Sequence, residues 1–549
     1  MLRWIRSTDR TAWLLAGLAL LLYAPGLIWG LPHATSEVTI RGWDVDSVAG
    51  ISPLSELHNL LVRAQPGWYY AYPLFHYLVL GVCYAPYMAF LWLSGGLHAP
   101  TAQYPYGFTD PVHAIAMLAL IGRAVSVLMA TGTVVATYLA ARTIWDRRTG
   151  IIAALAMLLC GPLVYYAHAG NLDVPVLFWV SLCVLAGARI VRYGLTVRRA
   201  IGFGVLAALA VATKDQAYGA LVPAVGFLIV MHWRDSRQNP GSAAPWRAPL
   251  AMIVAGLVAF AFANGIVFRP DRFLNHVKFL LNFEQTFVNV VNFSGVVHPR
   301  TLAGYLMLLR DIALAMYQSM GPVMLLAAIA GVFACWRGNR FVWLVVAMLL
   351  GYFILVIGPI RHMHYRWAMM PMLFLVFPAA RLLTMGIESA GIRRMIAVAA
   401  TLVGLGWLGG WAVDMRYQVW QDARYEAGDW LAAHAKPGDK VGFFGSVGQL
   451  PQIPRDVLPV SIRSDSASRQ LQASGARLVL VIPDYSSQGT VGLERSLYLP
   501  ESTYHELQSG SLGFTRVARF ATEPLPFIGR KLTYLPIVNP PVQIFQRTP

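Results

Sequence analysis

Long apolar segments separated by short polar connections make up most of the chain. A transmembrane helix needs about 20 consecutive apolar residues to cross roughly 30 Å of hydrocarbon. Two shorter apolar stretches share residues 200–232, where Lys214-Asp215-Gln216 interrupts them. The runs of spanning length lie at residues 12–31, 124–144, 150–167, 175–193, 248–268, 319–336, 341–358, 367–385 and 394–413. The pattern predicts a polytopic α-helical membrane protein with about eleven transmembrane helices.

Basic residues gather in every second connection between these runs. The basic clusters are Arg3/Arg6/Arg10, Arg142/Arg147/Arg148, Arg189/Arg192/Arg198/Arg199, Arg234/Arg237/Arg247, Arg337/Arg340 and Arg393/Arg394. Short loops rich in Arg and Lys stay on the cytoplasmic side of a membrane. The N-terminus is therefore predicted to be cytoplasmic. The alternate connections, which are longer and carry acidic residues or histidine, are predicted to face outward.

The composition supports a membrane class and argues against nucleic-acid binding. Of the 549 residues, 57% are hydrophobic and 13% are charged, and the formal net charge is +17. Soluble domains carry about 25% charged residues. The basic excess lies in loops between apolar runs, not on a polar domain with interleaved aromatic residues, so nucleic acid is not an expected partner. The four cysteines have no CxxC spacing and predict neither a disulfide framework nor a metal site.

The first outer connection contains a further apolar run at residues 70–94. A crossing here would place every later arginine cluster outside, so this segment is predicted to be re-entrant or to lie at the outer interface. Pro86 near its middle is expected to let the chain turn back. Before it, Ser52-Pro53 is typical of a helix start, and leucines at helical spacing follow as far as Pro66-Gly67. This stretch predicts an amphipathic interfacial helix.

The composition changes after residue 413, where helical and strand patterns alternate. Such alternation predicts a small α/β domain, which the order of crossings places outside the membrane. The expected division is a transmembrane domain at 1–413, with its first outer loop at 32–111, and an extracytoplasmic domain at 414–549. Within the latter, the expected elements are a helix at 425–434 and strands at 440–444, 477–482 and 514–520.

Asp44-Val45-Asp46 is the only closely spaced acidic pair in the first outer loop. Two such carboxylates can supply a general base and its polar support, or can bind a divalent cation. Acidic pairs are also common in ordinary loops, and this alternative stays open. Trp43 and the following interfacial helix are expected to hold the pair at the height of the membrane surface. Asp44 and Asp46 are therefore candidate catalytic residues, with either one as the base.

Two further polar turns lie at the ends of apolar runs. His168, Asn171 and Asp173 occur within six residues at a helix mouth. Asp173 is a further candidate catalytic residue, and His168 and Asn171 are candidate substrate- or phosphate-binding residues. Because Asp173 comes shortly before Pro175, its alternative role is to cap the helix. Lys214 is expected below the outer surface, either as a cation for an anionic substrate or in a local ion pair with Asp215.

A cationic cluster lies between the runs that end at Gly358 and begin at Trp367. It consists of Arg361, His362, His364, Tyr365 and Arg366. Arginines on the outer side run against the charge bias of the loops, and their planar donors suit phosphate. The cluster is a candidate phosphate clamp, with interfacial anchoring as the alternative. Metal binding by the two histidines is disfavoured because no third ligand lies nearby in the sequence.

These features together resemble a known family over nearly the whole membrane region. The resembling features are Asp44/Asp46, Tyr72-Pro73-Leu74-Phe75-His76-Tyr77, Arg123 through Arg142, His168 to Asp173, Thr213-Lys214, and Arg361 to Arg366 followed by Pro371. The pattern resembles the GT-C superfamily of glycosyltransferases, specifically bacterial family 39 members related to protein O-mannosyltransferases and lipid A aminoarabinose transferases. Many family 39 relatives have adjacent Asp-Glu in place of the spaced pair found here.

The resemblance implies an enzyme of the bacterial inner membrane that transfers a hexosyl or pentosyl group. It implies a polyprenyl-phosphate sugar donor and a glycan, lipid or protein acceptor on the outer side. No cofactor is required by the sequence, and a divalent cation at Asp44 and Asp46 is the one candidate. The rival classes are a transporter or lipid flippase, and a binding or assembly protein that acts through its C-terminal domain. A transporter predicts internal repeats in paired halves, and we find no such repeat.

Overall fold

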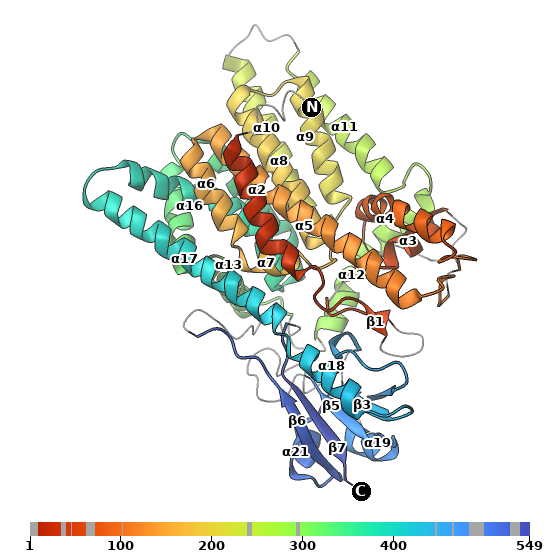
Figure 1. Ribbon diagram of the computed structural model, residues 1–549. Helices are drawn as coiled ribbons and strands as arrows, with labels where there is room; N and C mark the ends of the chain where they lie inside the picture. Colours follow the sequence, from red (N-terminus) through yellow and green to blue (C-terminus); the bar gives the residue numbers. More distant parts are fainter. Residues whose placement is uncertain are drawn as a thin grey trace. The chain divides into compact units, whose positions relative to one another are not determined.

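The computed structural model (Figure 1) describes residues 9–34, 40–44, 47–61, 72–101, 103–238, 244–292, 297–444, 447–463, 466–482, 499–526 and 538–548. The chain forms two compact units. The helical unit consists of Met1–Pro25, Ser52–Cys83 and Arg123–Ala412, and the mixed unit consists of Gly26–Ile51, Tyr84–Gly122 and Val413–Pro549.

The structure confirms a polytopic helical membrane protein with a small C-terminal sheet domain. Within the described residues, eight helical stretches are long and apolar enough to span a membrane. They are Phe75–Leu93, Pro111–Ile144, Asp173–Tyr193, Asp215–Gln238, Leu302–Cys335, Arg340–Ile360, Tyr365–Glu388 and Ile392–His434. The count of eleven is not confirmed. Three predicted spans correspond to shorter helices, α2 (Arg10–Tyr23), α9 (Val197–Val211) and α11 (Arg247–Ala263).

Glycine and proline divide some of the apolar runs. The run at 150–167 was expected as one span, but it forms two helices, α6 (Arg147–Leu158) and α7 (Gly161–Tyr166). Pro162 lacks an N–H and suits the first turn of a new helix, so α7 starts where α6 ends. In α13 (Leu302–Cys335), Gly321 has a φ of 69° just before Pro322, and the helix is kinked there. These breaks depend on single glycine and proline residues. A mean hydropathy taken over a long window does not detect them.

Helices α3 (Ser52–Leu61) and α4 (Phe75–Leu93) occupy the first outer connection. The predicted helix start at Ser52-Pro53 is confirmed. The predicted turn-back at Pro86 is wrong, because α4 continues through it. A proline removes only one hydrogen bond from the ladder, and the apolar turns on both sides keep the helix together. A location of α4 at the outer interface stays a prediction.

Glu56 gives α3 a pH-dependent contribution to stability. Burial raises the pKa of this half-buried carboxyl to about 7 from its ordinary value of 4.5. The unfolded chain therefore loses this proton near pH 4.5, while the folded chain keeps it up to about pH 7. As a result, the free energy of unfolding falls as the pH rises from about 4.5 to about 7 and is level above that.

Glu56→Gln is expected to remove this pH dependence. The thermal midpoints of the wild type and the variant, compared at about pH 5 and about pH 7.5, should show a larger fall for the wild type. Glu501→Gln, at a carboxyl that is 73% exposed, is the control and should behave as the wild type does. An equal fall in the Glu56→Gln protein would contradict the assignment.

The mixed unit contains a five-stranded sheet in the order β4-β3-β5-β7-β6 (Figure 1). Strands β4, β3 and β5 run parallel, and β7 and β6 continue the sheet antiparallel. The strands are β3 (Lys440–Phe444), β4 (Leu458–Ile462), β5 (Leu478–Val481), β6 (Phe514–Phe520) and β7 (Val542–Arg547). The strands expected at 440–444, 477–482 and 514–520 are thus confirmed. Strand β4 was missed because Pro459 disfavours a strand, and the structure places β4 at the edge, where proline is tolerated.

Helices cover both faces of this sheet. Helix α18 (Ala423–His434) packs Ala427 and Leu431 against one face. Helices α19 (Ala467–Ala473) and α21 (Glu501–Ser509) pack against the other. Successive residues of β5 alternate between the two cores, as the side-chain period of two requires. The division of the chain at residue 413 stays a prediction.

Candidate functional site

Three polar turns of the helical unit meet at Asp173. This residue opens helix α8 (Asp173–Tyr193), Lys214 follows α9, and Arg366 lies in the 3₁₀ helix η4 (Tyr365–Ala368). Lys214 Nζ lies 2.6 Å from Asp173 Oδ1, and Arg366 Nε lies 3.6 Å from Asp173 Oδ2. Residues taken from separate connections in the sequence therefore form one ionic cluster, which we call the Asp173 cluster.

The structure overturns the alternative role of Lys214 as a local partner of Asp215. The backbone at Lys214 is extended, with φ −154° and ψ 124°, so neighbouring side chains leave the chain on opposite sides. Lys214 therefore reaches Asp173. Asp215 instead lies 3.3 Å from His276 Nε2 of helix α12 (Pro270–Asn292).

The alternative role of Asp173 as a helix cap is also wrong. The carboxylate lies in the first turn of α8, and Leu172 is the capping residue. The Asn171 side chain supplies the local hydrogen bond, because its Oδ1 accepts from the backbone N–H of Asp173 at 3.1 Å. Both carboxylate oxygens of Asp173 remain directed to cations.

The Asp173 cluster places two cations beside one carboxylate in a buried place. The side chains of Asp173, Lys214 and Arg366 are 7%, 8% and 13% exposed. His364 adds no charge, because burial lowers its pKa to about 3 and the Arg366 guanidinium acts in the same direction. One carboxylate thus faces two cations. Buried charge is costly unless it is balanced, so the cluster favours an anionic ligand.

The remaining predicted residues near this cluster occupy packed positions. His168 is fully buried, with its ring 5.6 Å from that of Tyr165. Tyr365 Oη approaches Gly161 so closely that a Cβ there would meet it at 2.8 Å. The His362 ring lies 5.7 Å from Trp367 and 6.1 Å from His364.

Arg361 contacts a different part of the helical unit. It adopts the left-handed conformation, with a φ of 57°. Its NH1 group donates to the carbonyl oxygen of His298 at 2.9 Å, and the His298 N–H donates to the Arg361 carbonyl at 3.1 Å. Asp311 accepts from His298 Nε2 at 2.7 Å. Asp311 was not among the residues predicted from the sequence, where the charged Arg310-Asp311 pair within an apolar run was the only indication of it.

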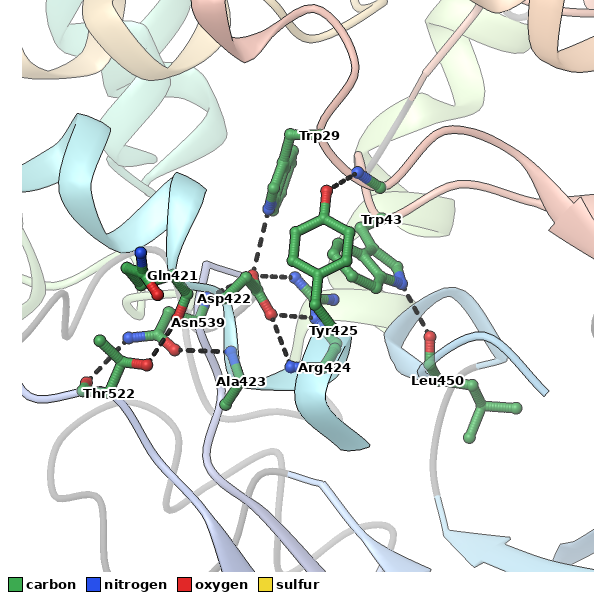
Figure 2. Close-up of polar contacts among 11 residues, drawn as sticks. Trp29, Trp43, Gln421, Asp422, Ala423, Arg424, Tyr425, Leu450, Thr522 and Asn539 are labelled. Carbon is green, nitrogen blue, oxygen red and sulfur yellow. Dashed lines mark hydrogen bonds and ion pairs between the residues drawn. The ribbon is translucent and has the colours of Figure 1, made fainter. Parts of the chain in front are cut away.

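Asp44 belongs to the mixed unit, where its neighbour Trp43 is fixed by packing (Figure 2). Trp43 is 2% exposed, and its Nε1–H donates to the Leu450 carbonyl at 2.7 Å. The Arg424 guanidinium lies 3.9 Å from the centroid of its ring. Trp43 thus holds the loop by packing within the mixed unit, and the height of the acidic pair relative to the membrane stays a prediction. Asp46 lies outside the described residues.

Asp422 is the centre of the contacts that hold this loop (Figure 2). It caps α18 by accepting from the Arg424 backbone N–H at 3.1 Å. The Arg424 side chain pairs with both of its oxygens, from Nε at 2.9 Å and from NH2 at 2.7 Å. Trp29 Nε1–H donates to it at 3.1 Å, and the Asn539 N–H at 2.8 Å. Five donors thus stabilise one fully buried carboxylate.

A comparison with protein families matches part of this chain. Residues 115–273 match the family model described as dolichyl-phosphate-mannose-protein mannosyltransferase. The matched segment contains His168, Asn171, Asp173 and Lys214. The match covers less than a third of the chain and agrees there with the resemblance drawn from the sequence. The described helices are those of a multi-pass membrane protein, and this segment of the chain is similar to that glycosyltransferase family.

No curated protein sequence matches this chain significantly. One solved structure with a similar chain trace is the Archaeoglobus fulgidus oligosaccharyltransferase in complex with Zn and sulfate. Its sequence identity is 11% and its TM-score 0.46, and the alignment covers 98% of this chain and 88% of that chain. ArnT from Cupriavidus metallidurans bound to undecaprenyl phosphate has 13% identity, a TM-score of 0.43, and coverage of 95% and 100%. These similarities are too weak to transfer any property to this chain.

Proposed function

We propose that this protein transfers a sugar from a polyprenyl-phosphate donor to an acceptor on the outer side of the membrane. The observation that carries the proposal is the pair of buried cations, Lys214 and Arg366, in the Asp173 cluster. Two of its three charged residues, Asp173 and Lys214, lie in the segment that matches the mannosyltransferase family. A buried cationic site fits the phosphate of a lipid-linked donor.

The reaction joins an acceptor hydroxyl oxygen to the anomeric carbon of the sugar. The bond from that carbon to the phosphate oxygen breaks, and the polyprenyl phosphate leaves with an additional negative charge. In the proposed reaction Lys214 and Arg366 stabilise this charge as it develops. Asp173 holds both cations in position before the donor arrives. The acceptor proton passes to Asp44 or Asp46, and the other carboxylate orients the base or supports a divalent cation.

In this proposal His168, Asn171, Tyr365 and His364 form the polar surroundings of the phosphate. His364, being neutral, can accept or donate a hydrogen bond without adding charge. Arg361 supports the same region by donating a hydrogen bond to the His298 carbonyl, which fixes the backbone at His298.

Lys214→Ala and Arg366→Ala are each expected to lower transfer by about a hundred- to a thousandfold. Removing a donor that strengthens as leaving-group charge grows costs about 2.7 to 4 kcal/mol of barrier. The purified protein in lipid vesicles would be supplied with a panel of synthetic undecaprenyl-phosphate sugars and with membranes as the source of acceptor. Release of undecaprenyl phosphate and labelling of acceptor would both be measured.

The control for this experiment is Arg394→Ala, at an exposed arginine of helix α17 (Ile392–Trp420), which should transfer at the wild-type rate. Native mass spectrometry would report undecaprenyl phosphate bound to each protein, and weaker binding is expected in both cluster variants. Turnover at the wild-type rate by both cluster variants would reject the Asp173 cluster as the phosphate site.

A further inference from the structure

The mixed unit contains a cavity of about 530 Å³. Its walls are residues 28–33 of the first loop, one face of helix α18, and residues 452–455. The α18 face consists of Tyr425, Gly428, Asp429 and Ala432, which recur at helical spacing. The volume lies within the range of about 300 to 1,000 Å³ that small-molecule sites occupy. Neither the family match nor the candidate catalytic residues account for this cavity.

A buried polar atom in the cavity wall is available to a ligand. His33 is 9% exposed, and its Nδ1 lies 3.1 Å from the Leu31 carbonyl. Its Nε2 is buried close to the backbone of Leu450 and Pro451, but it makes no hydrogen bond of good geometry with the residues that the structure describes. Burial lowers the pKa of His33, which keeps the ring neutral. A hydroxyl group suits such a nitrogen, because a hydroxyl can donate or accept.

The charges that line the cavity balance one another. The Arg424 guanidinium is paired with Asp422, and the remaining charges of the wall are one arginine, Arg455, and one aspartate, Asp429. The cavity therefore favours a neutral ligand over an ion. Gln452 adds both a donor and an acceptor.

Apolar groups complete the wall between these polar ones. Ile28, Leu31 and Ile453 face the same cavity as His33 and Gln452. A saccharide has a complementary combination of polar and apolar groups, because its ring carries hydroxyls around the edge and C–H groups on its faces. The donors, acceptors and apolar surfaces here are thus matched by a sugar better than by a hydrocarbon or a charged group.

We propose that this cavity binds a neutral saccharide unit of the acceptor. The proposal rests on the proposed glycosyl transfer and specifies the class of its acceptor. Trp43 lines the cavity, and the candidate base Asp44 is the next residue in the chain. An acceptor bound in the cavity is therefore held against the residue that precedes this base. The pairing of Arg424 with Asp422 keeps this wall fixed (Figure 2).

The test is protection of an engineered thiol. Ala432→Cys places a thiol in the cavity wall, and Ala433→Cys places one at an exposed neighbouring position that does not line the cavity. The full-length protein in detergent would react with N-ethylmaleimide in the presence of methyl glycosides of glucose, galactose, mannose, N-acetylglucosamine, arabinose and xylose. Peptide mass spectrometry separates the engineered sites from the native cysteines.

At least one glycoside is expected to slow alkylation of the Ala432→Cys protein and to leave Ala433→Cys unaffected. Protection follows 1 + [L]/Kd, so about 50 mM of a ligand with a Kd of about 10 mM gives about sixfold. Adding His33→Ala, or Gln452→Ala if the histidine variant does not fold, should abolish the protection. Absence of protection by every glycoside, equal protection at both positions, or protection by glucose 6-phosphate alone would overturn the proposal.

This assay needs neither donor nor turnover, so its result is independent of the proposed function. Transfer without protection would remove the saccharide site and leave the reaction standing. Protection without transfer would leave a saccharide-binding unit whose reaction has to be sought elsewhere.

Discussion

Replacing Asp44 or Asp46 with asparagine is expected to slow sugar transfer by about a hundred- to ten-thousandfold. Asparagine keeps the shape of the side chain but cannot take the acceptor proton. The donor phosphate is assigned to the Asp173 cluster, so the affinity for the lipid donor should be retained. The measurement compares the transfer rate of each purified variant with its binding of undecaprenyl phosphate.

Glu37→Gln is the matched control, because Glu37 is a lone acid of the same loop. It should transfer at the wild-type rate. The variant with the larger loss identifies the base, and a smaller loss in the other identifies the supporting carboxylate. If both Asp44→Asn and Asp46→Asn transfer normally, the base lies elsewhere, and Asp173 becomes the next candidate.

Asp422→Asn is expected to destabilise the mixed unit by about 3 to 5 kcal/mol, because it leaves the buried Arg424 charge uncompensated. Both side chains are 0% exposed. Hydrogen exchange of the full-length protein would report this loss as faster exchange at the amides of β3 and β5. The strands should be affected because α18, which Asp422 caps, packs Ala427 and Leu431 on their core.

Two comparisons separate loss of the ion pair from general damage. Asp429→Asn, at an exposed carboxylate on the same helix, should exchange as the wild type does. The double variant Asp422→Asn/Arg424→Met should recover part of the lost protection, since removing both charges abolishes the uncompensated one. Wild-type protection in Asp422→Asn alone would show that the pair does not hold the unit together.

The sequence predicts those parts of this fold that depend on neighbouring residues. Apolar runs located most of the long helices, and alternating patterns located β3, β5 and β6. The interruption at Lys214 was also visible, because a charged turn cannot continue an apolar helix. The continuity of α4 through Pro86 was not, since it depends on the strength of the flanking turns as much as on the proline.

Interactions between distant residues could not be predicted in the same way. Lys214 and Asp173 are 41 positions apart, and no local rule pairs them in preference to Lys214 and Asp215. The burial of Trp43 depends on Arg424. In the sequence, Arg424 cannot be distinguished from any other polar residue of an amphipathic helix. Polar residues at helix mouths could be identified as candidates, but their partners required the three-dimensional structure.

The contacts of the first loop also set the order in which this protein can be completed during synthesis. Trp29 bonds to Asp422, 393 positions later, and Trp43 bonds to Leu450, 407 positions later. A ribosome adds about 5 to 20 residues per second, so the loop waits roughly 20 to 80 s for its partners. During that interval the candidate base next to Trp43 has no fixed place. Assembly of this first loop is therefore among the last events in the biogenesis of the chain, after most of the helices have been made.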